Sequence, residues 1–152
     1  MRTYVNKITP TVLIACVIIL SLLGFADSLF LFVKKIAGGP IPCFIGTECD
    51  TVASSPYSNM FGIPLALYGV GFYLLTGVCA LVYLDTKKIL FMRLILPLTA
   101  LGFLMSLYFI YVQKFLIGAF CVYCIISAII SALLFIVGIA SYRISIPQQT
   151  LD

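Results

Sequence analysis

The stretch Phe115–Tyr142, FLIGAFCVYCIISAIISALLFIVGIASY, contains 28 residues and not one charged side chain. A helix needs about 20 consecutive apolar residues to cross the roughly 30 Å hydrocarbon core of a bilayer. The apolar run is continuous rather than alternating, which favours a helix over a barrel strand. We therefore expect a membrane-spanning helix at about residues 118–142.

Three further stretches have the same character, and their only charged residues are Asp27 and Arg93. Because lipid cannot hydrogen-bond to the backbone, each of these stretches is also expected to be helical. The sequence therefore predicts an all-α, polytopic membrane protein. We expect residues 1–152 to form one domain, a four-helix bundle with spans at about 11–33, 60–84, 89–112 and 118–142.

The overall composition agrees with a membrane protein. Of the 152 residues, 63% are hydrophobic and only 9% are charged, whereas a soluble domain has roughly 25% charged residues. The chain has no histidine, which excludes Ser-His-Asp triads, Cys-His nucleophile pairs and histidine-containing metal sites. The net charge of +4 sets membrane topology and does not indicate nucleic-acid binding. Six cysteines remain as candidates for redox chemistry.

The connections between the spans are unequal in length. Short turns are expected at 85–88 and at Gln113–Lys114, whereas residues 34–59 form a long polar loop rich in Gly, Pro and Ser. A loop of this length in a compact protein is usually functional or disordered. It contains Cys43 and Cys49, which favours a functional loop.

The basic residues predict the orientation in the cell membrane. With both termini in the cytoplasm, six basic residues lie on the cytoplasmic side and three on the other, as the positive-inside rule requires. Lys34 and Lys35 would then reach the membrane surface from the end of the first helix. The long loop and the start of the fourth helix would face the extracytoplasmic side. The two groups are Arg2, Lys7, Lys87, Lys88, Arg93 and Arg143, against Lys34, Lys35 and Lys114.

Cys121 and Cys124 form a CxxC motif at the outer end of the fourth span. Side chains three positions apart share a helix face, about 5–6 Å from each other, so small adjustments would close a disulfide. A helix N-terminus stabilises negative charge, which should make Cys121 more acidic than an ordinary thiol. The alternative is that both cysteines are small apolar core residues.

Cys43 and Cys49 are separated by five residues, and Gly46 lets the chain turn back between them. A local disulfide is feasible, and it could be a structural staple of the kind common outside the cytoplasm. The predicted topology puts this pair on the same membrane face as the CxxC motif. Two dithiol pairs on one face could pass electrons by thiol–disulfide exchange, without histidine or metal. A four-cysteine zinc site is disfavoured by the loop spacing.

Several residues inside the spans invite separate expectations. Cys16 and Cys79 are expected to be small buried residues. Asp27 is the only acid within a span, and such residues are functional unless they lie near the water boundary. Close approach of helices is expected at small residues, here Gly69, Gly71, Gly77 and Gly102.

The segment CDTVASSPYS at 49–58, followed by FGIP at 61–64 and Tyr68-Gly69, resembles the vitamin K epoxide reductase family. Prokaryotic members have a loop cysteine pair, a serine six residues after the second loop cysteine, a Gly-x-Pro that opens the second helix, and a CxxC near the start of the fourth. All four features occur here in that order, between Cys43 and Cys124.

The resemblance implies a role for each cysteine. Cys43 would exchange with an external thiol partner, and Cys49 would pass electrons inward through a mixed disulfide with Cys121. Cys124 would lie beside a quinone ring and reduce it, and Ser55 would support the quinone site. Many bacterial members carry a fused thioredoxin-like domain that is not seen in these 152 residues, so the thiol partner is expected to be a separate thioredoxin-like protein.

A quinone is lipid-soluble, so its site should open to the bilayer near the membrane surface. Aromatic side chains near the motifs could stack on the ring or simply fill the bundle; we expect Phe61, Tyr68 and Phe120 to contact it.

The expected function is therefore thiol oxidation coupled to reduction of a ubiquinone-type or menaquinone-type quinone, without a metal and without nucleic acid. Three alternatives remain at this point. One is a non-catalytic membrane protein with a structural loop disulfide, and another is a true vitamin K epoxide reductase. The third is the other four-helix, quinone-linked disulfide-forming family, which carries its CxxC in the first external loop.

Overall fold

Four long helices dominate the structure. The computed structural model describes the backbone of residues 2–43 and 48–149 and the side chains of residues 11–43 and 48–144. Each of the four helices contains a segment that is long and apolar enough to cross a membrane, so the prediction of an all-α, polytopic membrane protein is confirmed. These helices are α1 (Arg2–Ala37), α3 (Leu65–Thr86), α4 (Ile89–Val112) and α5 (Val122–Gln149).

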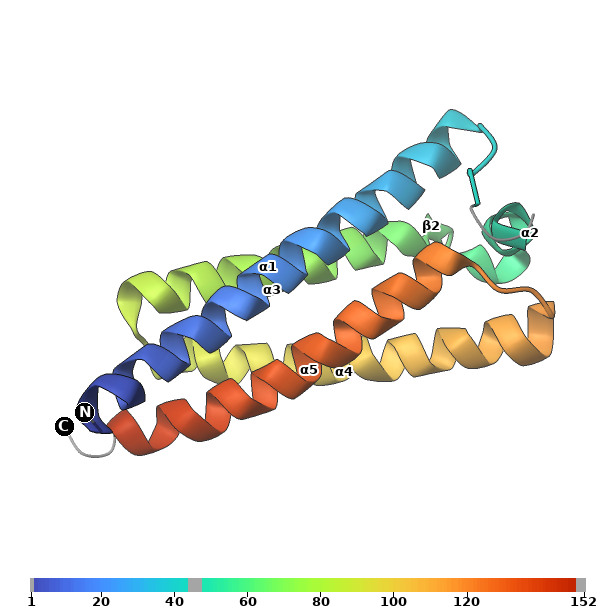
Figure 1. Cartoon of the computed structure of the whole chain (residues 1–152). Helices are drawn as coiled ribbons and strands as arrows, with labels where there is room; N and C mark the ends of the chain where they lie inside the picture. The colour runs from blue at the N-terminus through green and yellow to red at the C-terminus, as the bar shows by residue number, and fades with distance from the viewer. Residues whose placement is uncertain (1, 44–47, 150–152) are drawn as a thin grey trace.

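The helices form a bundle in which α1 packs against α3 and α5, and α4 packs against the same two helices. Helices α1 and α4 are therefore diagonal to each other. The start of α1 and the end of α5 lie together at one end of the bundle (Figure 1). The opposite end holds the short helix α2 (Glu48–Ser54), strand β2 (Ile63–Pro64) and the connection between α4 and α5. Both cysteine-bearing segments thus meet at the same end.

The predicted loop at 34–59 is more ordered than expected. Helix α1 continues to Ala37, so Lys34 and Lys35 lie in its last turn. The rest holds α2, a 3-10 turn at Pro56–Ser58 and strand β1 (Asn59–Met60), which pairs antiparallel with β2. Gly46, where we expected the loop to turn back, lies outside the described residues.

The second span begins later than predicted, at Leu65 instead of residue 60. Phe61 and Gly62 have positive φ values, 54° and 80°, which a right-handed helix cannot accommodate. They form the tip of the β1–β2 hairpin, which directs the chain into α3.

The predicted turn at Gln113–Lys114 is wrong. Residues Gln113–Ile117 form a single π-helical segment, η2, that extends α4. The chain turns afterwards at Gly118, with φ 71°, and α5 begins at Val122 rather than near residue 118. The physical reason is that Gln113 is buried, only 3% exposed, and its carbonyl accepts the N–H groups of Gly118 and Ala119.

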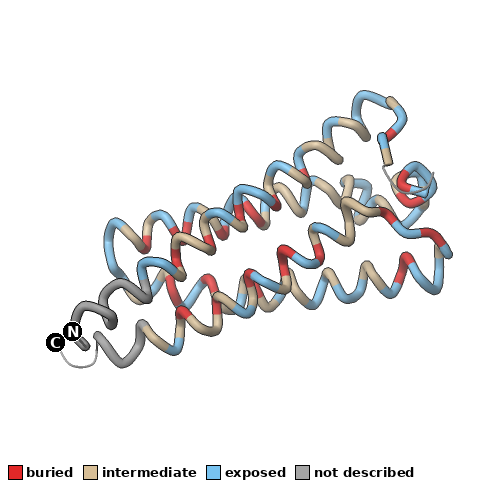
Figure 2. Tube along the Cα trace, viewed as in Figure 1, coloured by how far each residue is buried: buried red, intermediate tan, exposed pale blue. Residues whose placement is uncertain are grey.

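Small residues bring the helices close together, as lipid-embedded packing requires. A methyl group added at Gly69 would lie 2.6 Å from the Ser28 hydroxyl oxygen, and one at Gly102 would collide with the Phe72 ring. Gly77 likewise faces Ser21, whereas nothing lies within 4 Å of Gly71, so the expectation fails at that position. Buried residues follow the inner faces of the helices, and exposed ones face outward (Figure 2). Cys79 is buried as expected, but Cys16 is only half-buried.

Candidate redox site

The structure brings both cysteine pairs together. Cys43 and Cys49 form a disulfide with their Cα atoms 6.2 Å apart, and Cys121 and Cys124 are thiols. Cys49 is fully buried and Cys121 is 2% exposed. Both belong to one buried apolar cluster at the α2 end of the bundle, and the two partner cysteines pack against its edge. The other buried members of this cluster are Ile41, Val52 and Ala119.

Helix α2 positions Cys49 although it has only seven residues. Isolated helices of this length are unstable in water, so tertiary contacts must hold it. Val52 is buried on the same side as Cys49, and Asp50 Oδ1 accepts the backbone N–H of Ile41 at 2.9 Å. Two acids in the first turn, Glu48 and Asp50, also interact favourably with the positive end of the helix dipole.

Two hydrogen bonds join the loop pair directly to the CxxC segment. Glu48 Oε2 accepts the backbone N–H of Phe120 at 3.0 Å. The Tyr123 hydroxyl donates to the Pro42 carbonyl at 2.9 Å, while its ring lies 5.2 Å from that of Phe30. In each case the residue before a loop cysteine contacts the residue before a CxxC cysteine. We call these two hydrogen bonds the docking bonds.

Cys121 lies just before α5. Its backbone N–H donates to Gln113 Oε1 at 2.9 Å, which fixes the position of this residue. A hydrogen bond from the Cys124 thiol lowers the pKa of the Cys121 thiol to about 7. Burial opposes this shift, and the backbone N–H groups of Cys124 and Tyr123 add to it. The expected acidity of Cys121 therefore has a local cause: a thiol neighbour and two N–H groups at the start of α5.

This lowered pKa gives a testable pH dependence. The thiolate form of Cys121 should appear with a midpoint near pH 7 instead of the ordinary 9.0, because hydrogen bonds stabilise the charged form. The thiolate absorbance in the far ultraviolet, taken as the difference between the native chain and Cys121→Ser, measures it. In Cys124→Ala the midpoint should rise, since the main stabilising hydrogen bond is gone; an unchanged midpoint would assign the acidity to the backbone alone.

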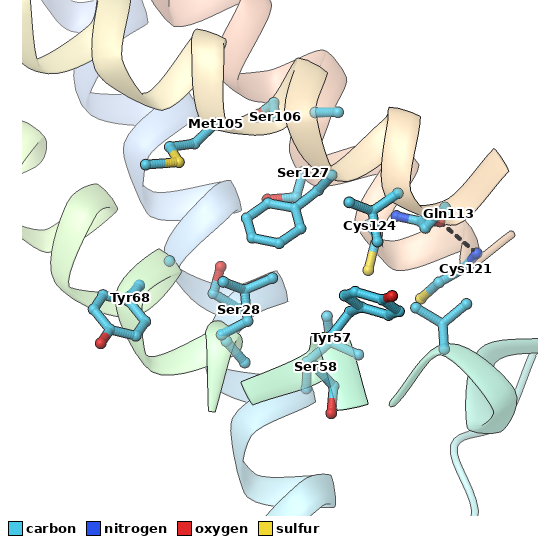
Figure 3. Close-up of a pocket in the computed structure, with 18 of the residues that line it drawn as sticks. Ser28, Tyr57, Ser58, Tyr68, Met105, Ser106, Gln113, Cys121, Cys124 and Ser127 are labelled. Atoms are coloured by element: carbon cyan, nitrogen blue, oxygen red, sulfur yellow. Dashed lines mark hydrogen bonds between the residues drawn. The ribbon is translucent and has the colours of Figure 1, made fainter. Parts of the chain in front are cut away.

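An apolar cavity of about 370 Å³ lies beside the cysteines, within the size range of small-ligand sites. Cys121 and Cys124 both line it, and the Cys124 sulfur points into it (Figure 3). The cavity continues along α4 past Met105 to Leu101. These two side chains are 41% and 55% exposed on the bundle surface, so the cavity reaches the lipid-facing side.

The residues predicted to contact a cofactor are only partly gathered at this cavity. Ser55 and Tyr68 line it. The Ser55 hydroxyl donates to the Val52 carbonyl at 2.7 Å, and the Tyr68 hydroxyl to that of Met60 at 3.2 Å. Phe61 is 89% exposed at the hairpin tip, and neither it nor Phe120 lines the cavity.

Lys35, Gln113 and Ser28 are among the cavity residues that were not singled out as site residues in the sequence. Lys35 lines the cavity, and its Nζ donates to the Ala53 carbonyl at 2.9 Å and to the Ser58 hydroxyl. It therefore connects the 53–58 segment to α1, in addition to the expected position at the membrane surface. Gln113 lines the cavity too. In the sequence, the only indication that Gln113 belongs to the site is that an uncharged polar side chain stands at the end of an apolar run.

Asp27 does not line the cavity. Its buried Oδ2 has no hydrogen-bond partner. Within the described residues, no group of three or more Cys, Asp or Glu side chains is arranged to hold a metal ion.

The comparison with protein families agrees with this site. A model of the vitamin K epoxide reductase family matches residues 15–139, a segment that contains both cysteine pairs and nearly all of the four spans. No curated protein matches the chain. The chain therefore belongs to the vitamin K epoxide reductase family and is a membrane oxidoreductase of that type, with a quinone-type compound as its substrate.

Proposed function

We propose that this protein oxidises the thiols of an extracytoplasmic thioredoxin-like protein and passes the electrons to a membrane quinone, thereby sustaining disulfide formation. The observation that carries the proposal is the shared cluster of Cys49 and Cys121, beside an apolar cavity that Cys121 and Cys124 both line. A dithiol relay needs its two pairs adjacent and its acceptor site in contact with the second pair. The contacts of this site meet both requirements.

The reaction balances as two electrons and two protons. A dithiol of the partner reduces the Cys43–Cys49 disulfide and is itself oxidised. The Cys49 thiolate then attacks Cys121 in a Cys121–Cys124 disulfide, which releases Cys124 and forms a Cys49–Cys121 mixed disulfide. Cys43 attacks Cys49, which restores the loop disulfide and frees Cys121. The Cys121–Cys124 dithiol finally gives two electrons and two protons to the quinone, and its disulfide closes again.

The lowered pKa of Cys121 favours the inward direction of this path. When Cys43 resolves the mixed disulfide, Cys121 is the leaving group, and a thiol of lower pKa leaves faster. With a pKa of about 7, Cys121 leaves as a thiolate near neutral pH. The described arrangement, a loop disulfide with two CxxC thiols, corresponds to the state in which the electrons have reached the second pair.

The quinone would be one of the lipid pool, of ubiquinone or menaquinone type. The apolar lining of the cavity and its exposed rim at Leu101 and Met105 suit a ring that enters from the bilayer with an apolar tail. Such a substrate buries its ring without needing a charged partner.

The orientation follows from charge and compartment. The start of α1 and the end of α5 lie at one end of the bundle (Figure 1), and so do Lys87 and Lys88 between α3 and α4. We assign this end to the cytoplasm by the positive-inside rule. The cysteines then lie on the extracytoplasmic side, where disulfides persist and where the separate thioredoxin-like partner would dock at Cys43.

The relay is tested by trapping its intermediate in cells. A Cys43→Ala, Cys124→Ala double variant can form the Cys49–Cys121 bond but cannot resolve it. A non-reducing gel after cleavage between residues 49 and 121 should show the two fragments linked. A protein with a purely structural loop disulfide would show no such link, and this outcome would end the proposal.

The docking bonds should control the transfer between the two pairs. Tyr123→Phe removes the hydroxyl that binds the Pro42 carbonyl, and Glu48→Gln replaces the anion that binds the Phe120 N–H with a neutral acceptor. Tyr123→Phe loses a neutral hydrogen bond, which contributes about 0.5–1.5 kcal/mol, and Glu48→Gln loses only the difference between a charged bond of roughly 1.5–3 kcal/mol and a neutral one. We therefore expect transfer to slow by roughly 3-fold to 10-fold for each change.

Stopped-flow measurement of loop reoxidation isolates this transfer step. Tyr111→Phe, on the exposed surface of α4, is the matched control and should leave the rate unchanged. Equal rates in Tyr123→Phe, Glu48→Gln and the native chain would show that the apolar cluster alone aligns the cysteines.

A further inference from the structure

Most polar side chains around the cavity are already hydrogen-bonded, chiefly to backbone carbonyls. A quinone carbonyl accepts hydrogen bonds and cannot donate them, so only an unused N–H or O–H group could bind it. Most hydroxyl and ammonium groups of the wall already donate to protein acceptors. The Tyr57 hydroxyl has no partner among the described residues, but Tyr57 is 43% exposed, so it can reach water, unlike a buried donor. The occupied groups are Lys35, Ser55, Ser58, Tyr68, Tyr73, Ser106, Ser127 and Ser131.

Two buried residues of the wall keep unused donors. Gln113 is 3% exposed and Ser28 is 4% exposed. The Gln113 Oε1 accepts the Cys121 N–H, and because an N–H needs an oxygen acceptor, this fixes the amide orientation and leaves the NH₂ group without an acceptor among the described residues. The Ser28 hydroxyl has no hydrogen-bond partner there either. Both residues line the cavity, and neither donor atom is among the fully buried atoms that lack a partner in the described residues. Both donors are therefore open to a ligand in the cavity that supplies acceptors.

The two donors stand on opposite sides of the cavity. Ser28 belongs to α1 and Gln113 to η2 at the end of α4, and these helices are diagonal in the bundle. Figure 3 shows Ser28 and Gln113 on different walls, with the cavity and the Cys124 sulfur between them. A ligand that satisfied both would need acceptors on opposite edges of an apolar body.

We propose that the Gln113 amide and the Ser28 hydroxyl bind the two carbonyl oxygens of a 1,4-quinone ring. This inference rests on the proposed function and names the two side chains that hold the ring of its quinone, whose carbonyls lie on opposite sides. Gln113 would contact both the quinone and the cysteine pair. Its NH₂ group would donate to the ring, while its Oε1 accepts the backbone N–H of Cys121. Ser28 keeps its place because Gly69 leaves room for it: any side chain there would press on the hydroxyl oxygen.

The test measures quinone binding to the fully oxidised protein, in which no reaction can occur. A short-chain 1,4-benzoquinone is the probe, and its dissociation constant and infrared carbonyl bands are recorded. Ser28→Ala should raise the dissociation constant about 10-fold, the scale of one hydrogen bond, and return one carbonyl band to its unbonded position. Ser21→Ala is the matched control, because Ser21 lies two turns earlier on α1, is also buried without a partner, and does not line the cavity.

Gln113→Glu separates binding from folding. It keeps an acceptor for the Cys121 N–H, but it can donate to the ring only when protonated. We expect weak binding at high pH, restored as the pH falls, which a purely structural role would not produce. If the native chain binds the quinone but neither variant alters its affinity or its bands, the inference is overturned and the proposed function stands. If the native chain binds no quinone, the proposed function itself fails.

Discussion

Cys124→Ala should lower quinone-dependent turnover by roughly 1,000-fold or more, the scale on which loss of a covalent nucleophile acts. Cys124 lies in the first turn of α5 with its sulfur in the cavity (Figure 3). Without it, Cys121 is a single thiol and cannot deliver two electrons by closing a disulfide. The loop pair Cys43–Cys49 stays intact, so the variant should still exchange disulfides with a thioredoxin-like donor once per molecule.

The measurement is quinone absorbance during steady-state turnover, alongside a single-turnover assay of donor oxidation. Cys79→Ala is the matched control, because Cys79 is a buried cysteine of α3 that packs in the other half of the bundle and does not line the cavity. It should retain near-native turnover. Quinone reduction at the native rate by Cys124→Ala would remove this residue from the electron path.

The four spans were predictable because lipid imposes a single rule on the backbone, and long apolar runs satisfy that rule only as helices. The ends of the spans were less predictable, because local charge or polarity does not decide them. Gln113 and Lys114 interrupt the apolar run and suggested a turn, yet Gln113 is buried and extends α4 through η2. Helix α2 has too little length to form alone and depends on contacts with residues distant in sequence.

The cysteine site was also predictable only in part. Spacing and family resemblance singled out the four cysteines as candidates, but their meeting depends on the loop folding back over the start of α5, which no local pattern encodes. The aromatic residues were chosen by closeness in sequence. Tyr68 lines the cavity, but Phe61 and Phe120 do not, because closeness in sequence does not fix the direction of a side chain. Phe120 precedes Cys121 directly, but it uses its backbone N–H to bind Glu48 while its ring stays 42% exposed.

Quinone reduction requires the cavity, whereas disulfide exchange between the two cysteine pairs does not. A substitution that fills the cavity should therefore affect only quinone reduction. Ala66→Trp would place an indole ring in the cavity, since Ala66 lines it from the first turn of α3. We expect kcat/KM for the quinone to fall by roughly 100-fold, equal to about 2.7 kcal/mol, because the ring of the substrate and the indole cannot occupy the same space. Formation of the trapped Cys49–Cys121 disulfide should continue, since Ala66 is not part of the cysteine cluster.

Leu67→Trp provides the matched control for this change. Leu67 is the next residue of α3, is 39% exposed and does not line the cavity, so the same indole would project from the bundle surface. Its kcat/KM should stay near the native value. If Ala66→Trp reduces quinone as fast as Leu67→Trp does, the acceptor must reach Cys124 by another route, and the cavity would have no part in the reaction. If Ala66→Trp also blocks the mixed disulfide, the indole has displaced α5, and the loss cannot be assigned to substrate exclusion.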